Sequence, residues 1–152
     1  MKTKLLACLL CALSLVLCLT ACVGQIEDTN GEDTSLCVIT DEDITEKKPS
    51  YSAVGMVRSQ VNGKQSIRVN QISGVYELDA YTAEGGTLTL TLSTTLYEGN
   101  LRIVLLCDGT YLQDIPVGEA QTVVIPDANG KYQIRLAAES AKLDATLTIT
   151  EA

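Results

Sequence analysis

The chain has 152 residues, 46% of them hydrophobic and 20% charged, which is enough apolar material for one folded domain of ordinary size. Its 19 acidic and 11 basic residues give a net charge of −8 at pH 7, and this balance argues against nucleic acid as a partner. The absence of histidine removes the commonest general base and the commonest metal ligand. We therefore expect a protein that is not an enzyme and that has no cofactor or metal site.

The first residues have the three parts of a secretory signal peptide. Lys2 and Lys4 precede residues 5–19, which carry no charge, and small residues follow. The apolar run is shorter than the roughly 20 residues that a membrane-spanning helix needs. This pattern predicts export of the chain.

Residues 19–22, Leu-Thr-Ala-Cys, resemble the lipobox of bacterial lipoproteins. The resemblance implies a signal peptide of residues 1–21, cleaved between Ala21 and Cys22, and a diacylglycerol on the Cys22 thiol. Two or three acyl chains exceed the single chain that gives only reversible attachment. We therefore expect the mature protein at the cell membrane, lipid-anchored through Cys22 on the extracytoplasmic face. The alternative is that the cysteines of this segment are only small apolar residues of a signal peptide cut elsewhere, or of an uncleaved anchor.

Residues 22–50 are acidic, with few large apolar side chains and no sustained period. Such a composition cannot bury enough apolar surface to offset the entropy of ordering, so we predict a disordered tether. The carboxylates of residues 41–43 offer oxygen ligands for calcium. Glu46 stands where an EF-hand loop has its turn glycine, however, and we predict no metal site here.

Residues 51–152 alternate apolar and polar side chains over short runs separated by turn residues. This pattern predicts an all-β fold, a single β-sandwich or jelly-roll-like domain of about eight or nine short strands. The pairs Asn-Gly at 62–63 and Asp-Gly at 108–109 predict two-residue hairpin turns. Further turns are expected at 73–74 and at 98–100, and no helix is predicted.

Residues 101–106 are apolar on both sides of the alternation, so we place this strand centrally, with both faces buried. Residues 99–104, 108–109, 130–135 and 141–149 resemble the small β-sandwich modules of lipoproteins from Gram-positive, often gut-dwelling, bacteria. These modules are similar in layout to pre-peptidase C-terminal-type domains. The resemblance covers most of residues 51–152 through turn glycines and one core tyrosine, and it implies a fold and a location but no site residue.

Covalent chemistry finds little support in the sequence. Cys37 and Cys107 either pair as a disulfide or remain a free thiol and a buried side chain, and the sequence leaves both possibilities open. Ser140 and Lys142 fall on one face of an extended strand, but no oxyanion-forming glycine motif accompanies them. Paired acids such as those at 77 and 79 are more typical of the solvent side of a strand. We therefore predict no catalytic residue.

Two kinds of binding function remain. The main expectation is a structural or accessory domain that contacts another envelope protein. The alternative is an extracytoplasmic carbohydrate-binding or cell-wall-binding module, with Tyr81 and Tyr97 as possible ligand contacts, because flat aromatic rings stack on sugars. Tyrosines exposed on one face would favour a glycan, whereas an apolar patch beside residues 101–106 would favour a protein partner.

Overall fold

The computed structural model describes residues 39–152. This part of the chain contains one short helix and seven strands, all paired antiparallel: α2 (Asp41–Thr45), β1 (Tyr51–Val54), β2 (Val57–Val61), β3 (Lys64–Glu84), β4 (Leu88–Cys107), β5 (Thr110–Ile115), β6 (Gln121–Ile125) and β7 (Asn129–Glu151). The predicted signal peptide, the cleavage and lipidation sites at Ala21 and Cys22, and Cys37 lie outside the described residues.

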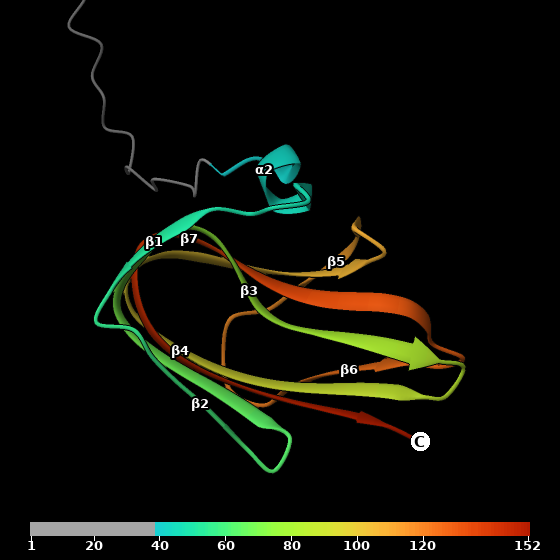
Figure 1. The fold of residues 1–152 in the computed structure, drawn as a ribbon. Helices are drawn as coiled ribbons and strands as arrows, with labels where there is room; N and C mark the ends of the chain where they lie inside the picture. Colours follow the sequence, from blue (N-terminus) through green and yellow to red (C-terminus); the bar gives the residue numbers. More distant parts are fainter. Residues whose placement is uncertain (1–38) are drawn as a thin grey trace, which may run out of the picture. The chain divides into compact units, whose positions relative to one another are not determined.

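All seven strands belong to one sheet of order β1-β3-β7-β4-β5, in which β2 also pairs with β3 and β6 with β4. The three central strands are long, with 21, 20 and 23 residues, and they curve back on themselves so that the sheet folds into two facing layers (Figure 1). Layer A contains β2, β6 and residues 64–69, 88–96 and 143–151 of the long strands. Layer B contains β5 and residues 74–84, 101–107 and 129–138. The predicted all-β sandwich is confirmed.

The turns expected at 73–74 and 98–100 are wrong, because the chain continues there as strand. The ladder instead shifts register at these points, and a glycine occupies each bend. Gly74 has φ +102°, and a Cβ on it would lie 2.4 Å from the Ser50 carbonyl oxygen. Gly99 has φ +78°, and its Cβ would lie 2.4 Å from the Ser140 carbonyl oxygen. Bends of this kind replace turns, so three long strands take the place of several short ones.

The two predicted hairpin turns are confirmed. Asn62 and Gly63 have φ of 51° and 74°, and Val61 pairs directly with Lys64. Asp108 and Gly109 have φ of 51° and 79° between β4 and β5. Positive φ at both central residues is what the tight turn of a hairpin requires.

The hydrophobic core lies between the two layers. Alternate residues of each long strand point inward, and their side chains are 0–1% exposed; they include Leu88, Leu90, Leu92, Ile103, Leu105, Ile134 and Leu136. Tyr132 is also buried, as expected of the one tyrosine assigned to the core. The core therefore depends on the period-two alternation that the sequence shows.

Helix α2 covers the outer face of layer B (Figure 1). Its Ile44 is 1% exposed and belongs to a second apolar cluster with Val75, Val104, Leu106 and Ala137. The predicted burial on both faces is confirmed for residues 103–106, where α2 is the cover on the second face, whereas residues 101 and 102 are half-buried.

This helix corrects two expectations, because no helix was predicted and residues up to 50 were assigned to the tether. A capping box joins Thr40 and Asp43 at its start, and the buried Arg135 donates to the carbonyl oxygens of Ile44 and Glu46 at its end. The folded part therefore begins before residue 51. A five-residue helix with a single buried side chain is too short to show a helical period.

Candidate functional site

The outer face of layer A carries many serine and threonine hydroxyl groups. The alternation that buries the leucines of β4 turns the threonines and serines outward, and neighbouring strands do the same. Register places Thr91 opposite Thr148 and Ser93 opposite Thr146, with Ser66 of β3 beside Thr146. The result is a sheet surface of short polar side chains, which leaves ring-sized ligands room to lie against it.

At the bend end of this face stand four larger side chains, Arg68, Tyr97, Lys142 and Asp144, which we call the Tyr97 cluster. The Arg68 guanidinium forms a bidentate ion pair with Asp144, with Nε–Oδ1 at 3.0 Å and Nη2–Oδ2 at 3.1 Å. The Tyr97 hydroxyl donates to Asp144 Oδ2 at 3.2 Å. The Lys142 ammonium lies 6.0 Å from the centroid of the Tyr97 ring.

The electrostatics of the Tyr97 cluster follow from these contacts. The hydrogen bond from Arg68, more than any other contact, lowers the pKa of Asp144, and that from Tyr97 lowers it further. Asp144 is therefore ionised at neutral pH and serves as a hydrogen-bond acceptor. The Tyr97 side chain is 55% exposed, so its ring is held by its hydroxyl while its surface faces solvent.

Two adjoining hollows flank the ion pair. One, of about 300 Å³, is lined by Val57, Ser59, Ser66, Ile67, Arg68, Asp144, Ala145 and Thr146. The other, of about 210 Å³, is lined by Arg68, Val69, Asn70, Tyr97, Lys142 and Asp144. They share Arg68 and Asp144, so the ion pair lies between the two hollows. Such a surface offers an aromatic ring, charged donors and acceptors, and hydroxyls.

The other predicted ligand contact, Tyr81, lies elsewhere. Its hydroxyl donates to Glu151 Oε2 at 2.9 Å, and this hydrogen bond raises the pKa of Tyr81. Glu151 also accepts from the backbone amides of Glu84 and Gly86, both at 3.0 Å, and these bonds lower its pKa. Tyr81 is half-buried against the core and ties the end of β3 to the end of β7, so the structure does not bring it together with Tyr97.

The remaining tyrosines also differ in role. Tyr76 is 3% exposed and its ring lies 4.8 Å from that of Tyr51 in a T-shaped contact, and burial raises the pKa of Tyr76. A register shift between residues 77 and 79 turns both Tyr76 and Tyr81 toward the core, although strict alternation predicts opposite faces. Tyr111 is exposed on β5, with the Arg102 guanidinium 5.8 Å from its ring centroid.

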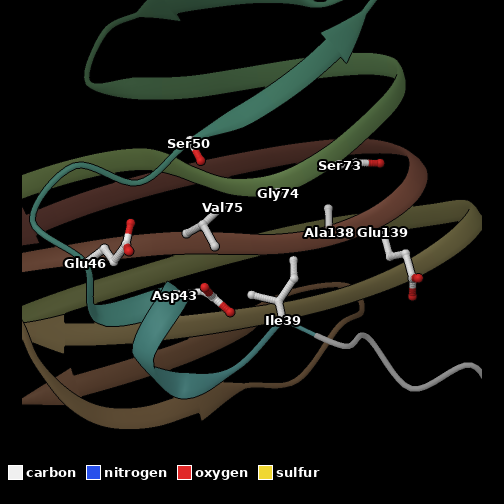
Figure 2. Close-up of a pocket in the computed structure, with 9 residues that line it drawn as sticks. All are labelled: Ile39, Asp43, Glu46, Ser50, Ser73, Gly74, Val75, Ala138 and Glu139. Atoms are coloured by element: carbon white, nitrogen blue, oxygen red, sulfur yellow. The ribbon is translucent and has the colours of Figure 1, made fainter.

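A third hollow, of about 420 Å³, lies between α2 and layer B (Figure 2). Asp43 and Glu46 border it from the α2 side, and Val75 and Ala138 come from the strands. The Asp43 carboxylate accepts from the Thr40 backbone amide at 2.8 Å, so it serves the helix cap. Asp41 is instead paired with Arg102, and no three potential metal ligands converge within residues 39–152.

The structure also places Cys107 and Ser140, which the sequence analysis weighed for covalent chemistry. Cys107 has a free, half-buried thiol whose sulfur lies 3.7 Å from the Asn129 carbonyl oxygen. Ser140 adopts φ 47° at the bend of β7, and its amide donates to the Ser73 hydroxyl. Across residues 39–152, moreover, no helix is long and apolar enough to cross a membrane.

Sequence reasoning found Tyr97 but missed its partners. Arg68 and Asp144 are separated by 76 positions and meet only because β3 and β7 pair in this register. The one available signal is that both are charged residues on the polar side of an alternating strand. That signal is shared by most charged residues of a sheet.

No protein-family model and no curated protein sequence matches this chain. Among solved structures, a mutant of a family 29 carbohydrate-binding module is similar with 12% identity and a TM-score of 0.37, over 69% of this chain and 82% of that one. A family 6 carbohydrate-binding module from Clostridium stercorarium, in complex with cellobiose, has 15% identity and a TM-score of 0.35, over 68% and 87%. The cupin domain of CENP-C from Drosophila melanogaster has 12% identity and a TM-score of 0.31, over 66% and 80%. At these scores the likenesses carry no argument about a ligand or a site.

Proposed function

We propose that this chain is a non-catalytic glycan-binding protein held at the outer side of a cell membrane. The observation that carries the proposal is the Tyr97 cluster, where a 55% exposed ring stands beside an ion-paired Arg68 and Asp144 between two hollows. The apolar faces of sugars stack on aromatic rings, and their hydroxyls exchange hydrogen bonds with charged groups. The hydroxyl-covered face of layer A extends this surface beyond one sugar.

The site is organised before any ligand arrives. Asp144 orients the Tyr97 hydroxyl, Arg68 orients Asp144, and all three side chains project from paired strands. A preorganised site loses less conformational entropy on binding, which raises affinity without added contacts. This geometry therefore favours recognition of a ligand over a purely structural role for Tyr97.

The absence of catalysis is part of the proposal. Most glycoside hydrolysis uses two carboxyl groups that flank the scissile bond, one of them protonated to act as the acid. The Tyr97 cluster contains a single carboxylate, Asp144, and its lowered pKa keeps that group ionised. Asp144 is suited to accept hydrogen bonds from sugar hydroxyls and unsuited to donate a proton to a leaving group.

Membrane attachment rests on Cys22 and the lipobox-like residues before it, which lie outside the described part of the chain. A lipid at Cys22 would leave the folded residues facing the outside of the cell, where glycans are available. Labelled fatty acid should be incorporated into the wild-type chain and not into Cys22→Ala. Continued acylation of that variant would contradict this part of the proposal.

A second candidate function is docking of an envelope protein on β5. Tyr111 and Leu112 are 42% and 47% exposed on this strand, which within residues 39–152 pairs only with β4 and lies beside residues 101–107. Exposed apolar residues on a strand with a free edge are typical of protein contacts.

A glycan array probed with the full chain in detergent distinguishes the two candidates. The glycan proposal predicts binding that Tyr97→Ala weakens about tenfold or more and that the matched surface variant Tyr111→Ala retains. An envelope-protein partner that is captured by the wild type and lost in Tyr111→Ala, with no glycan bound, would instead favour the second candidate.

A further inference from the structure

We infer that the glycan is anionic, with a negatively charged sugar such as a uronic acid stacked on Tyr97, and that Lys142 recognises its charge. This inference rests on the proposed function. It concerns the 210 Å³ hollow of the Tyr97 cluster, which is lined by two cations, Arg68 and Lys142, and by one carboxylate, Asp144. Asn70 adds an uncharged amide to the same lining.

The excess positive charge belongs to Lys142. Arg68 is matched by Asp144 at 3.0 Å, so that pair is electrically neutral as a unit. Within residues 39–152, by contrast, no carboxylate lies within 4.0 Å of the Lys142 ammonium, which contacts the Tyr97 ring instead. Glu98 stands opposite Lys142 across β4 and β7, but the two do not reach ion-pair distance.

The net charge of the whole chain is opposite in sign to the local excess of positive charge at Lys142. With a net charge of −8, the protein as a whole repels anions, and salt screens that repulsion beyond about 10 Å. An anionic ligand must therefore be attracted by a cation in direct contact. A lysine left without a carboxylate partner inside a hollow supplies that contact, and the same positive charge disfavours a cationic ligand there.

The position of the ammonium fits a charged sugar ring. The carboxylate of a uronic acid is bonded directly to the sugar ring, so a ring stacked on Tyr97 carries its charge close to the aromatic face. The Lys142 ammonium lies over the Tyr97 ring, 6.0 Å from the ring centroid. It is thus placed to meet the carboxylate, while the Arg68 and Asp144 pair remains available for neighbouring hydroxyls.

The test uses the full chain in detergent and a panel of galacturonate, glucuronate and mannuronate oligomers, each paired with its neutral methyl ester. We expect at least one acid to bind, with esterification weakening its binding about tenfold or more. Lys142→Met should weaken binding of the acid to a similar extent and should weaken binding of the ester much less. Lys131→Met is the matched control, because Lys131 is an exposed lysine in layer B, and it should change neither.

The possible results distinguish failure of the anionic assignment from failure of the proposed glycan-binding function. If acid and ester bind equally, with Tyr97→Ala weakening both, the anionic assignment is overturned and the glycan-binding function stands. Equal loss of acid and ester binding in Lys142→Met would also overturn it, because the lysine would then act without regard to charge. If no glycan of either kind binds, both the function and the inference fail.

Discussion

Truncation of Ile44 to alanine tests the unexpected finding that residues before 51 belong to the folded part of the chain. Ile44 is 1% exposed and packs on Val75, Val104 and Leu106. Replacing a buried isoleucine by alanine typically costs about 2–5 kcal/mol in the free energy of unfolding. We expect about 2–3 kcal/mol, the low end, because α2 lies at the surface and can settle toward the sheet.

That loss is large against a total stability of about 5–15 kcal/mol for a domain of this kind. Urea unfolding of the full chain in detergent, followed by circular dichroism, measures it. Hydrogen exchange of the Ile44→Ala variant, read by mass spectrometry, should also be faster in residues 39–50 than in residues 51–152. The reason is that a five-residue helix does not persist without its packing. Val124→Ala, at a 58% exposed position on β6, is the control and should change stability by less than about 0.5 kcal/mol.

The packing of α2 on layer B is refuted if Ile44→Ala leaves the unfolding midpoint unchanged. It is also refuted if residues 39–50 exchange in the wild type as fast as an unfolded peptide. Either result would mean that α2 does not cover layer B in solution and that the acidic segment is a tether throughout.

Three further predictions follow from single contacts. Gly99→Ala should destabilise the chain by more than Gly63→Ala. Both glycines have φ near +75°, but only at Gly99 would the added Cβ meet a backbone oxygen, at 2.4 Å. Equal shifts of the melting temperature would argue against the bend at Gly99. Asp144→Asn should cost less than about 1 kcal/mol at pH 7, as exposed ion pairs do, and the difference from wild type should fade as pH drops below about 3.8 and through the lowered pKa. A difference that persists at the lowest pH would show that the effect of Asp144 is not electrostatic. Cys22→Ala should release the protein from washed membranes, and full retention would refute attachment by a lipid at that residue.

The fold was predictable where local signals are strong. Asn62-Gly63 and Asp108-Gly109 need positive φ at both positions, and few other structures accommodate such pairs, so both hairpins are confirmed. The apolar residues Val104 and Leu106 predicted from the sequence that some element covers the second face of this strand, and both are buried. What covers it was not readable, because α2 contributes a single buried side chain.

The bends were misread for a different physical reason. Glycine with positive φ serves equally as a turn residue and as a bulge, and the sequence around Gly74 does not distinguish the two. Only the pairing of β3 with β7 on both sides of that glycine shows that the strand continues.

The candidate site was half predictable. The sequence predicts Tyr97 as a ligand contact, but the proposed site also needs Arg68 and Asp144, which lie on other strands. Tyr81 satisfied the same sequence criterion, and its hydroxyl instead holds Glu151 at the end of the sheet. Side chains that meet through sheet register leave no pattern in a single sequence.

The proposed glycan site is tested best by calorimetric titration of the best-binding array glycan into the full chain, its Tyr97→Ala variant and its Tyr111→Ala variant. Both tyrosines are exposed and both have a cation near the ring, so the comparison isolates position on the fold. We predict that Tyr97→Ala weakens binding about tenfold or more, equivalent to about 1.4 kcal/mol, and that Tyr111→Ala stays within about twofold of the wild type. Equal affinities of the three proteins, or a loss confined to Tyr111→Ala, would contradict the assignment of the glycan site to the Tyr97 cluster.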